Sequence, residues 1–264
     1  MAAITAFMIV RNEEVLLPRC LTSLAGVVDE LVVLDTGSTD GTTRLLDRTA
    51  ASGRFARVRW EPHGFTDFGT ARQAALDRVT TPWALWLDAD EEISPMLRAR
   101  LLDLRQSGHL ADHDGWRIRR ANRVLGRVMK ARKLAADYGL RLFRTEAGRL
   151  SEALVHEGIV MAPGTSTGRI DEPIYHDTLT AIRPYLRKVD RYTNLDVAQP
   201  GDKRFDLLHL CVTGPLTFFR EYLGRGCARD GWPGFVWSAI AAWTAVQRDW
   251  KRLRRDWQTS GRNG

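Results

Sequence analysis

The strongest constraint on the fold is a series of short apolar segments that alternate with segments of helical character. The apolar segments, ITAFMIV, ELVVL, ARVRW and WALWL, span residues 4–10, 30–34, 56–60 and 83–87. They are rich in β-branched or aromatic residues and have the length of buried strands. The intervening sequence predicts helices over 16–24, from the turn at 36–42 to about residue 51, and over 70–79. Strands that alternate with helices predict βαβ units and a mostly parallel sheet, which is the α/β class.

The later part of the chain has a different pattern. Segments 115–120 and 139–144, GWRIRR and GLRLFR, predict strands that expose alternate basic side chains. Helical or amphipathic segments follow at 181–197, 204–224 and 235–257. Gly201 and Asp202 predict a linker. We therefore expect one domain over 1–200 and a C-terminal helical extension over 201–264.

Composition excludes several classes of protein. The chain has 264 residues, 39 basic and 32 acidic side chains, and a formal charge of +7. This is a globular composition with enough sequence to bury a core, so a disordered or collagen-like chain is excluded. The three cysteines, Cys20, Cys211 and Cys227, are far apart, which predicts buried thiols in a reducing compartment. Charge arrives at Arg11 and no apolar stretch reaches ~18 residues, so we expect neither a signal peptide nor a transmembrane helix.

Three of the expected strands end in acidic or amide side chains. These residues are Asn12, Glu13, Glu14, Asp35, Asp88 and Asp90. Ligands of open α/β sheets bind beyond the carboxyl ends of the strands, so we expect these side chains to converge on one crevice. There, Asp35 is suited to accept hydrogen bonds from a nucleobase or a ribose.

Two local motifs have chemistry of their own. Asp88 and Asp90, one residue apart after a buried strand, suit a hard cation such as Mg²⁺ or Mn²⁺ that also binds substrate phosphates. An isolated pair of this kind is more often a solvated turn or a helix cap. The loop over 35–42, DTGSTDGT, offers backbone N–H groups near a helix N-terminus, where a phosphate can bind. The loop is neither a GxGxxG fingerprint nor a Walker A sequence.

Taken together, four motifs resemble family-2 glycosyltransferases of the GT-A fold. They are RNEE, VVLDTGSTDGT, DFGTARQAAL and WALWLDADEE, in this order. The resemblance covers about residues 3–200. Through DFGTARQAAL, WRIRRANRVLGR, GLRLFR, VHE and YHD the chain is most similar to bacterial lipopolysaccharide core β-1,4-glucosyltransferases. This resemblance implies a Rossmann-like, mixed and mostly parallel sheet flanked by helices.

The resemblance also implies a binding site for a UDP-sugar. Asp35 is the residue implied to bind the uracil ring, and Arg72 the one near the base and the diphosphate. An arginine suits that position because its planar set of donors matches phosphate oxygens. Asp88 is placed near the ribose, and Asn12 and Glu14 belong to the same nucleotide-sugar site.

The metal site and the general base are implied in the same way. Asp90 is the implied direct ligand of Mg²⁺ or Mn²⁺, with Asp88 beside it and His176 completing the site. Glu157 is the expected general base, because a carboxylate can take the proton of the acceptor hydroxyl. Alternatively, Glu157 is structural and His156 or Asp177 has the larger role.

The expected reaction is the inverting transfer of a single sugar, with glucose favoured, to a lipopolysaccharide core or another envelope glycan. Inversion is a family expectation. Single addition is favoured because the chain lacks the ED and QxxRW motifs of processive synthases. Two alternatives remain open, a protein or peptide glycosyltransferase of the same fold and a basic nucleic-acid-binding module.

Basic residues and tryptophans point to an anionic partner. Eight basic and no acidic side chains lie between Arg117 and Lys133, and five of the nine tryptophans lie beyond residue 230. Apolar and tryptophan residues followed by basic ones, as in 232–255, are typical of an interfacial helix on an anionic membrane surface. We expect a cytoplasmic protein, peripheral at the inner face of the cytoplasmic membrane, with an anionic glycolipid or oligosaccharide acceptor. Alternatively, these helices only pack on the catalytic domain.

Overall fold

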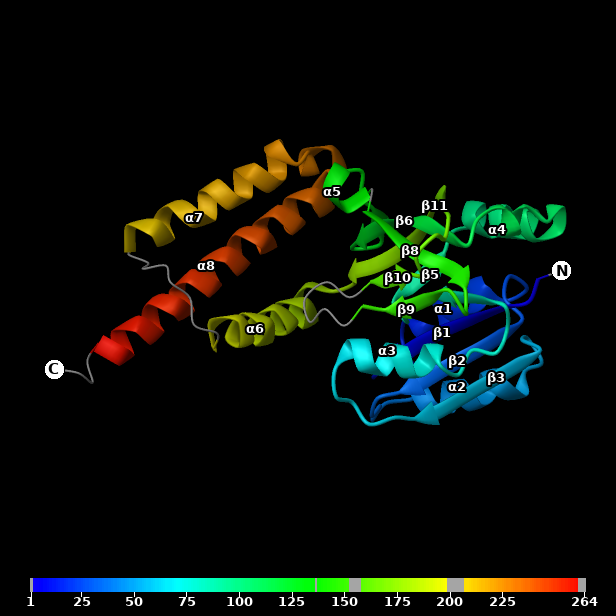
Figure 1. The fold of residues 1–264 in the computed structure, drawn as a ribbon. Helices are drawn as coiled ribbons and strands as arrows, with labels where there is room; N and C mark the ends of the chain where they lie inside the picture. Colours follow the sequence, from blue (N-terminus) through cyan, green and yellow to red (C-terminus); the bar gives the residue numbers. More distant parts are fainter. Residues whose placement is uncertain (1, 136, 152–157, 199–206, 261–264) are drawn as a thin grey trace. The chain divides into compact units, whose positions relative to one another are not determined.

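The protein consists of two compact units. The computed structural model describes residues 2–135, 137–151, 158–198 and 207–260 (Figure 1). The first unit contains residues 1–121 and 137–176, and the second contains 122–136 and 177–264. The expected boundary at residue 200 and the expected linker lie outside the described residues, so that division of the chain stays a prediction.

The first unit contains the parallel half of the main sheet. Its strands are β1 (Ile4–Val10), β2 (Glu30–Asp35), β3 (Arg57–Pro62) and β4 (Trp83–Trp86), in the order β3-β2-β1-β4. All three pairings are parallel, and the register places Val10 opposite Asp35 and Phe7 opposite Trp86. The four predicted strands are confirmed, and their carboxyl ends lie at one edge of the sheet.

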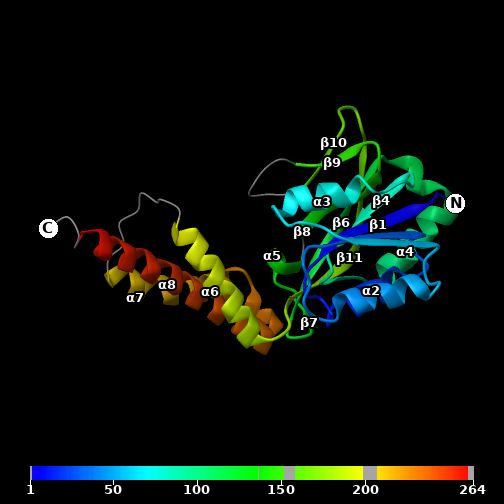
Figure 2. The same ribbon diagram turned by 90° about the horizontal axis from the view of Figure 1, so that it is seen from below.

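Helices cover both faces of this half of the sheet. They are α1 (Leu17–Leu24), α2 (Thr42–Ala51), α3 (Phe68–Leu76) and α4 (Pro95–Ser107). Alternate side chains of a strand point to opposite faces. Ile4 and Met8 accordingly pack in one cluster with α1, α2 and α4, whereas Phe7 packs in another with α3. Figure 2 shows α3 on one side of the sheet and α2 and α4 on the other.

Local capping sets the start of two of these helices. The Asp67 side chain accepts a hydrogen bond from the backbone N–H of Thr70 at 2.7 Å, so α3 begins before the predicted position. Ser94 caps α4 through the N–H of Leu97 at 3.1 Å, and proline follows at the first helical position. Gly108, with a left-handed φ of 83°, ends α4.

The remaining strands form the antiparallel half of the sheet. A 3-10 turn (His109–Asp112) precedes β6 (Gly115–Val124), and the other strands are β5 (Glu91–Ile93), β8 (Asp137–Arg144) and β11 (Thr167–Leu179). From β4 the order continues β8-β6-β11-β5, and β9 (Gly148–Leu150) pairs with β10 (Ile159–Met161) in a separate two-stranded sheet. A mixed sheet flanked by helices confirms the predicted fold class. The chain passes between the two units within β6 and within β11.

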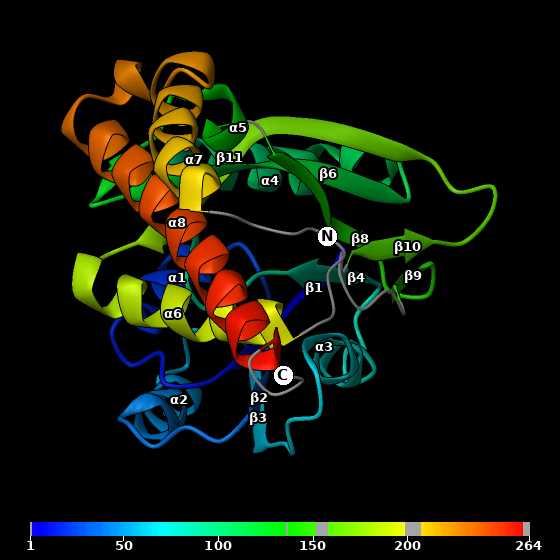
Figure 3. The same ribbon diagram turned by 90° about the vertical axis from the view of Figure 1, so that its left-hand side faces the viewer.

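The second unit is mainly helical. It contains β7 (Arg127–Val128), α5 (Arg132–Ala135), α6 (Ile182–Ala198), α7 (Leu207–Phe219), a π-helical turn (Arg220–Gly224), a 3-10 turn (Cys227–Asp230) and α8 (Trp232–Ser260). α8 contacts both α6 and α7 (Figure 3). Its apolar residues Val236 and Ile240 pack with Met129 and Leu179 in one buried cluster. The helical character expected beyond residue 180 is therefore confirmed.

Two contacts explain how the N-terminus of α8 is fixed. A Cβ atom at Gly234 would lie 1.8 Å from the carbonyl oxygen of Cys227, so only glycine allows this approach. Asp230 accepts hydrogen bonds from the backbone N–H groups of Lys130 and Ala131, at 2.6 and 3.0 Å. These bonds join residues far apart in the sequence within one unit.

The structure shows the surroundings of the three cysteines and the character of the helices, on which two expectations from composition were based. Cys20 and Cys227 are buried free thiols, as expected, but Cys211 is exposed because part of the α7 surface is not covered by other helices. No helix in the described part of the chain combines the length and the apolar composition needed to cross a membrane.

Candidate functional site

The polar side chains that follow β1, β2 and β4 lie at the carboxyl edge of the sheet in the first unit. These three strands are adjacent in the order β2-β1-β4 and are parallel. Their ends therefore meet at one edge, as in other α/β sheets that bind ligands there. The candidate site is built from this edge, from α3, and from β8 and β11 of the antiparallel half.

Asp35 ends β2 as a buried carboxylate. Both of its oxygens accept from the backbone N–H of Ser38 at 3.2 Å, and the Ser38 hydroxyl also donates to it. These contacts fix the orientation of the carboxylate. Its predicted contact with a uracil ring stays a prediction.

Asn12 and Glu14 hold the loop that follows β2. The Asn12 side-chain oxygen accepts from the N–H of Thr39 at 2.7 Å, and Glu14 Oε2 accepts from the N–H of Gly41 at 2.6 Å. Asn12 has a left-handed φ of 57°, a conformation that asparagine tolerates better than most residues. Their predicted binding to the nucleotide sugar stays a prediction, whereas their role in ordering the loop is visible in the structure.

The loop itself differs from expectation. Its N–H groups at Ser38, Thr39, Gly41 and Thr42 all donate to side-chain oxygens of this chain. These four N–H groups therefore already have acceptors within the chain, and the expectation that the loop binds a phosphate stays a prediction. The sequence pattern predicted a turn near a helix N-terminus correctly but not the acceptors that occupy it.

Asp88 lies within a cationic and aromatic cluster. Arg72 Nη2 donates to Asp88 Oδ1 at 3.1 Å, and the indole N–H of Trp86 donates to the same oxygen at 3.3 Å. The Arg72 guanidinium also lies 5.0 Å from the centre of the Trp86 ring, a cation–π distance. The structure thus brings together Arg72 and Asp88, two residues that the sequence placed in the donor site.

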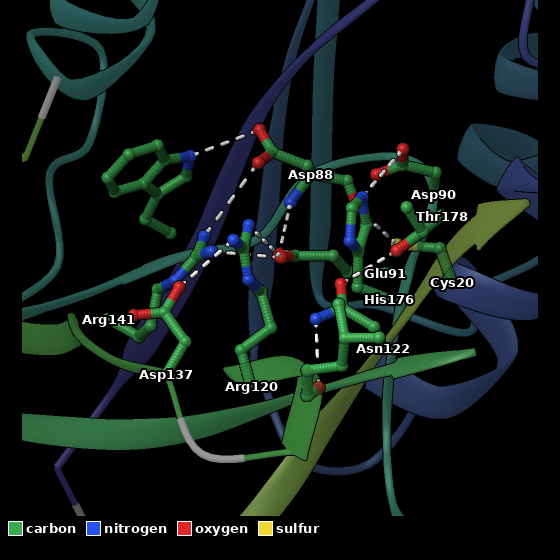
Figure 4. Close-up of polar contacts among 12 residues, drawn as sticks. Cys20, Asp88, Asp90, Glu91, Arg120, Asn122, Asp137, Arg141, His176 and Thr178 are labelled. Atoms are coloured by element: carbon green, nitrogen blue, oxygen red, sulfur yellow. Dashed lines mark hydrogen bonds and ion pairs between the residues drawn. The ribbon is translucent and has the colours of Figure 1, made fainter. Parts of the chain in front are cut away.

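Asp90 faces His176. Asp90 Oδ2 and His176 Nε2 are 3.2 Å apart, and both side chains are partly exposed. The antiparallel register of β5 and β11 places His176 opposite Glu91, which explains why a residue 86 positions away reaches the DxD segment. The two residues predicted to share a metal ion are therefore neighbours (Figure 4).

A buried ion pair between Glu91 and Arg141 lies beside the DxD segment, and it was not predicted from the sequence. Glu91 is 1% exposed, and its carboxylate accepts from Arg141 Nη2 at 2.8 Å and from the backbone N–H of Asp88 at 3.0 Å. Arg141 is 6% exposed, so the expectation that alternate basic residues of 139–144 are exposed is wrong at this position. It is buried because β8 pairs with both β4 and β6 in the middle of the sheet.

Arg141 also links the ion pair to the candidate donor site. Its Nη1 atom lies 3.9 Å from Asp88 Oδ2, and its guanidinium lies 4.6 Å from the centre of the Trp86 ring. Burial raises the pKa of the Glu91 carboxyl, and the neighbouring Arg141 charge opposes that increase. An acidic residue directly after DxD and an arginine in a mid-sheet strand were the only sequence signals for this pair.

The acidic character of the site extends to Cys20 on α1. Burial raises the pKa of this thiol, and the carboxylates of Glu91, Asp90 and Asp88 raise it further. The thiol donates weakly to the carbonyl oxygen of Asp88 at 3.7 Å. Cys20 is therefore a neutral packing residue behind the DxD segment.

A divalent cation at this site would need ligands beyond those that the protein side chains supply. Among the described residues, no group of three or more His, Cys, Asp or Glu side chains is arranged to hold a metal ion. Mg²⁺ is commonly bound by one or two carboxylates, with water and substrate phosphates completing the shell. Asp90 and His176, which are adjacent and partly exposed, fit such a site in which the donor diphosphate supplies further ligands.

The predicted general base cannot be placed. Glu157 and the alternative His156 lie outside the described residues. The other alternative, Asp177, belongs to the second unit and forms an ion pair with Arg123 at 3.6 Å. The assignment of the general base to Glu157 therefore stays a prediction.

The basic segment 117–133 is not one surface. Arg120 pairs with Asp137 at 3.0 Å, and Arg119 Nε donates to the carbonyl oxygen of Asp171 at 2.6 Å. The segment also crosses from the first unit into the second at residue 122. Acids of β8 and β11, which are distant in sequence, pair with Arg120 and Arg123, so part of this positive charge is neutralised within the chain.

Comparisons with known proteins agree with this architecture. The family model described as "Glycosyl transferase family 2" matches residues 5–157. The chain is 32% identical over 240 residues to the lipopolysaccharide core biosynthesis glycosyltransferase LpsC of Rhizobium meliloti, which covers 88% of this chain and 85% of the relative. It is 24% identical over 260 residues to an uncharacterised glycosyltransferase of Rickettsia felis, which covers 94% of this chain and 88% of the relative.

A solved structure shows the same fold. The mannosyltransferase PcManGT from Pyrobaculum calidifontis, in complex with GDP-Man and Mn²⁺, superposes with a TM-score of 0.53 at 15% identity. The match covers 96% of this chain and 87% of that chain. Because the family model spans more than half of the chain and LpsC is similar along most of its length, this protein belongs to glycosyl transferase family 2 and is a glycosyltransferase.

Proposed function

We propose that the protein transfers a single sugar from a UDP-sugar to a lipopolysaccharide core or a related envelope glycan. The observation that carries the proposal is the joint placement of Asp88 against Arg72 and of Asp90 against His176 at one edge of the sheet. The similarity to LpsC, which is named as a lipopolysaccharide core enzyme, supports this class of acceptor. Membership of an enzyme family disfavours the alternative of a nucleic-acid-binding module.

The donor site is proposed to run from Asp35 to Asp88. Asp35, fixed by Ser38, accepts from the uracil ring, and Asp88 accepts from the ribose. Arg72 is partly exposed beside Asp88 and binds the diphosphate with its planar donors. Arg141 adds a buried positive charge behind Asp88, where it stabilises the negative charge of the departing nucleotide.

Asp90 and His176 are proposed to hold Mg²⁺ or Mn²⁺ together with the donor phosphates. When bound, such an ion neutralises negative charge on the leaving diphosphate. Glu91 is a positioning residue in this scheme, because it binds the N–H of Asp88 and so fixes the backbone from which both aspartates project.

Glu157 is proposed, from the family resemblance, to take the proton of the acceptor hydroxyl while the oxygen attacks the anomeric carbon from the face opposite the nucleotide. One proton moves to the carboxylate, the new C–O bond forms, and the bond to the UDP oxygen breaks with inversion. Glucose is the favoured sugar. A protein or peptide acceptor on the same fold is the alternative.

The acceptor is proposed to be an anionic glycolipid or oligosaccharide. For a lipid-linked acceptor, we place the protein at the inner face of the cytoplasmic membrane as a peripheral protein. The tryptophans and basic residues of the C-terminal part support this location.

The test is a thermal-shift panel of nucleotide sugars with and without Mn²⁺, followed by a transfer assay with the donor that binds. We expect one UDP-sugar to raise the melting temperature in a metal-dependent manner, and Asp90→Asn to abolish that shift and lower transfer at least ~100-fold. Asp103→Asn, in the exposed ion pair with Arg100 on α4, is the matched control and should retain both properties.

A second variant separates the base from the donor site. Glu157→Gln should retain the donor-induced shift while transfer falls by roughly 100- to 10,000-fold. Metal-independent binding in wild type and in Asp90→Asn would contradict the metal site, and full transfer by Glu157→Gln would contradict its role as base.

A further inference from the structure

The second unit exposes a continuous apolar surface on α7 and the start of α8. Its residues, called here the α7 apolar surface, are Val212, Leu216, Phe219, Leu223, Trp232 and Phe235. The first four follow a spacing of four, three and four residues, which places them on one face of the helix. Leu216, Leu223 and Trp232 are 62%, 63% and 66% exposed, far more than an apolar side chain of a packed helix.

Aromatic contacts make this surface continuous between the two helices. The ring of Phe218 lies 5.6 Å from that of Phe219 and 5.5 Å from that of Phe235. Phe235 in turn stacks on Trp232, with ring centres 5.5 Å apart and nearly parallel planes. An apolar side chain on α7 and a tryptophan on α8 are thus connected through one packed group of rings.

The structure changes which part of the tail can meet a partner. The sequence pointed to the apolar run between residues 235 and 246 with its tryptophans, and to the earlier segment 207–223, which has a similar character. In the structure, Val236, Ile240 and Ala245 of that run are buried, and Trp237 lies beside Tyr185 with ring centres 6.2 Å apart. Most of this run is therefore buried or half-buried within the second unit, and the strongly exposed apolar side chains of this unit are those of the α7 apolar surface.

The charges around the α7 apolar surface are positive. Arg220 and Arg229 are exposed, and Arg225 is partly exposed. Glu221 is buried and pairs with Arg225 and, at 3.8 Å, with Arg220, whereas Asp230 keeps its negative charge while it binds backbone N–H groups. The three arginines therefore exceed the two nearby acids by one positive charge, and the side chain of Arg229 remains exposed. Apolar side chains with adjacent arginines complement an anionic lipid surface, in which the chains enter the interface and the arginines meet the headgroups.

We propose that the α7 apolar surface is the site at which this protein docks onto an anionic lipid bilayer. The inference deepens the proposed function and rests on it, because a lipid-linked acceptor lies at such a surface. α7 has 13 residues, about 20 Å at the helical rise, and so it lies along the interface and does not span the ~30 Å hydrocarbon layer. Two copies meeting through this face would bring their arginines together, which favours lipid over self-association.

The test is flotation of the full-length protein with vesicles of phosphatidylcholine alone and of phosphatidylcholine with about one third phosphatidylglycerol. We expect wild type to float with the anionic vesicles and weakly or not at all with the neutral ones. The Leu216→Ser/Leu223→Ser variant should bind the anionic vesicles at least tenfold more weakly. Arg220→Gln/Arg229→Gln should weaken binding and reduce its dependence on salt.

The matched control is Met96→Ser/Val160→Ser, which removes two apolar side chains of similar exposure, 59% and 57%, from the first unit. It should float like wild type. Equal binding of the Leu216/Leu223 variant and wild type would overturn the proposal, as would equal flotation with neutral and anionic vesicles. A dimer in light scattering that the Leu216/Leu223 variant dissociates, without vesicle flotation by wild type, would assign the surface to self-association.

Donor binding keeps this test separate from the proposed function. The Leu216→Ser/Leu223→Ser variant should retain the UDP-sugar thermal shift, because the donor site lies in the first unit. Flotation without binding of any nucleotide sugar would refute the proposed donor and leave the lipid surface standing. Donor binding and transfer without flotation would refute the lipid surface alone.

Discussion

The two units treat their apolar side chains differently. In the first unit, Phe7, Leu46 and Phe143 are completely buried, because helices or strands cover both faces of the sheet. In the second, Leu216 and Leu223 remain more than half exposed on α7. Exposed apolar side chains of the first unit, such as Met96 and Val160, lie on different elements, whereas those of the second unit gather on α7 and the start of α8. The comparison indicates that only the second unit leaves a connected apolar surface available for a partner.

The units also differ in how they use charge. The first buries Glu91 and Arg141 together beside the DxD segment, where they orient functional groups. The second unit also buries a carboxylate, Glu221 beside Arg225, and it pairs Asp190 with Lys251 between α6 and α8, but these pairs support its own helices. Buried charge is costly unless it is paired, so its presence next to the candidate site marks the first unit as the one organised for chemistry.

The largest expected effect on stability comes from breaking the buried pair. Glu91→Gln should lower the free energy of unfolding by about 3–5 kcal/mol, because the buried Arg141 loses the Glu91 carboxylate at 2.8 Å and keeps that of Asp88 at 3.9 Å. Chemical denaturation measures this loss. Replacing both Glu91 and Arg141 with methionine should be less damaging than the single change, and additive losses in that double variant would contradict a coupled pair.

A smaller effect is expected where one carboxylate joins two segments of the second unit. Asp230→Ala should lower the free energy of unfolding by about 1–2 kcal/mol, because the N–H groups of Lys130 and Ala131 lose their acceptor. Hydrogen exchange should show faster exchange of these two amides in the variant. Unaltered exchange there would mean that water replaces the carboxylate without cost.

The smallest effect on stability is expected on the α7 apolar surface. Leu216→Ala should change the free energy of unfolding by less than about 0.5 kcal/mol, since the side chain is mostly exposed already. Ile240→Ala, in the buried cluster of the same unit, is the matched comparison and should cost about 2–4 kcal/mol. Similar losses for the two variants would show that α7 packs more closely than the contrast between the units implies.

The parallel half of the sheet and its acidic strand ends could be predicted from the sequence. Each strand there is a contiguous apolar run, and Asp35, Asp88 and Asp90 directly follow such runs, so local pattern determines both the element and the place of the side chain. His176 came from the family resemblance, and the antiparallel pairing of β11 with β5 explains its proximity to Asp90.

What could not be predicted depends on pairing between distant segments. The alternating pattern of residues 139–144 predicts that Arg141 is exposed. Its burial against Glu91 depends on the placement of β8 between β4 and β6. The loop after β2 has the sequence pattern of a phosphate site, and the pattern gives no sign that Asn12 and Glu14 accept from its N–H groups at Thr39 and Gly41. The exposure of α7 is equally invisible in the sequence, because α7 and α8 are both amphipathic and only packing decides which face is covered.

The passage of the chain between the units has a consequence for modularity. Residues 122–136, which run from the end of β6 to the start of β8, belong with the C-terminal helices, so the chain crosses from one unit to the other three times. No single cut in the gene separates the units, and a truncation after residue 176 would leave 122–136 without the residues they pack against. We therefore expect the first and second units to have evolved together within one chain, and neither to have been exchanged alone between proteins.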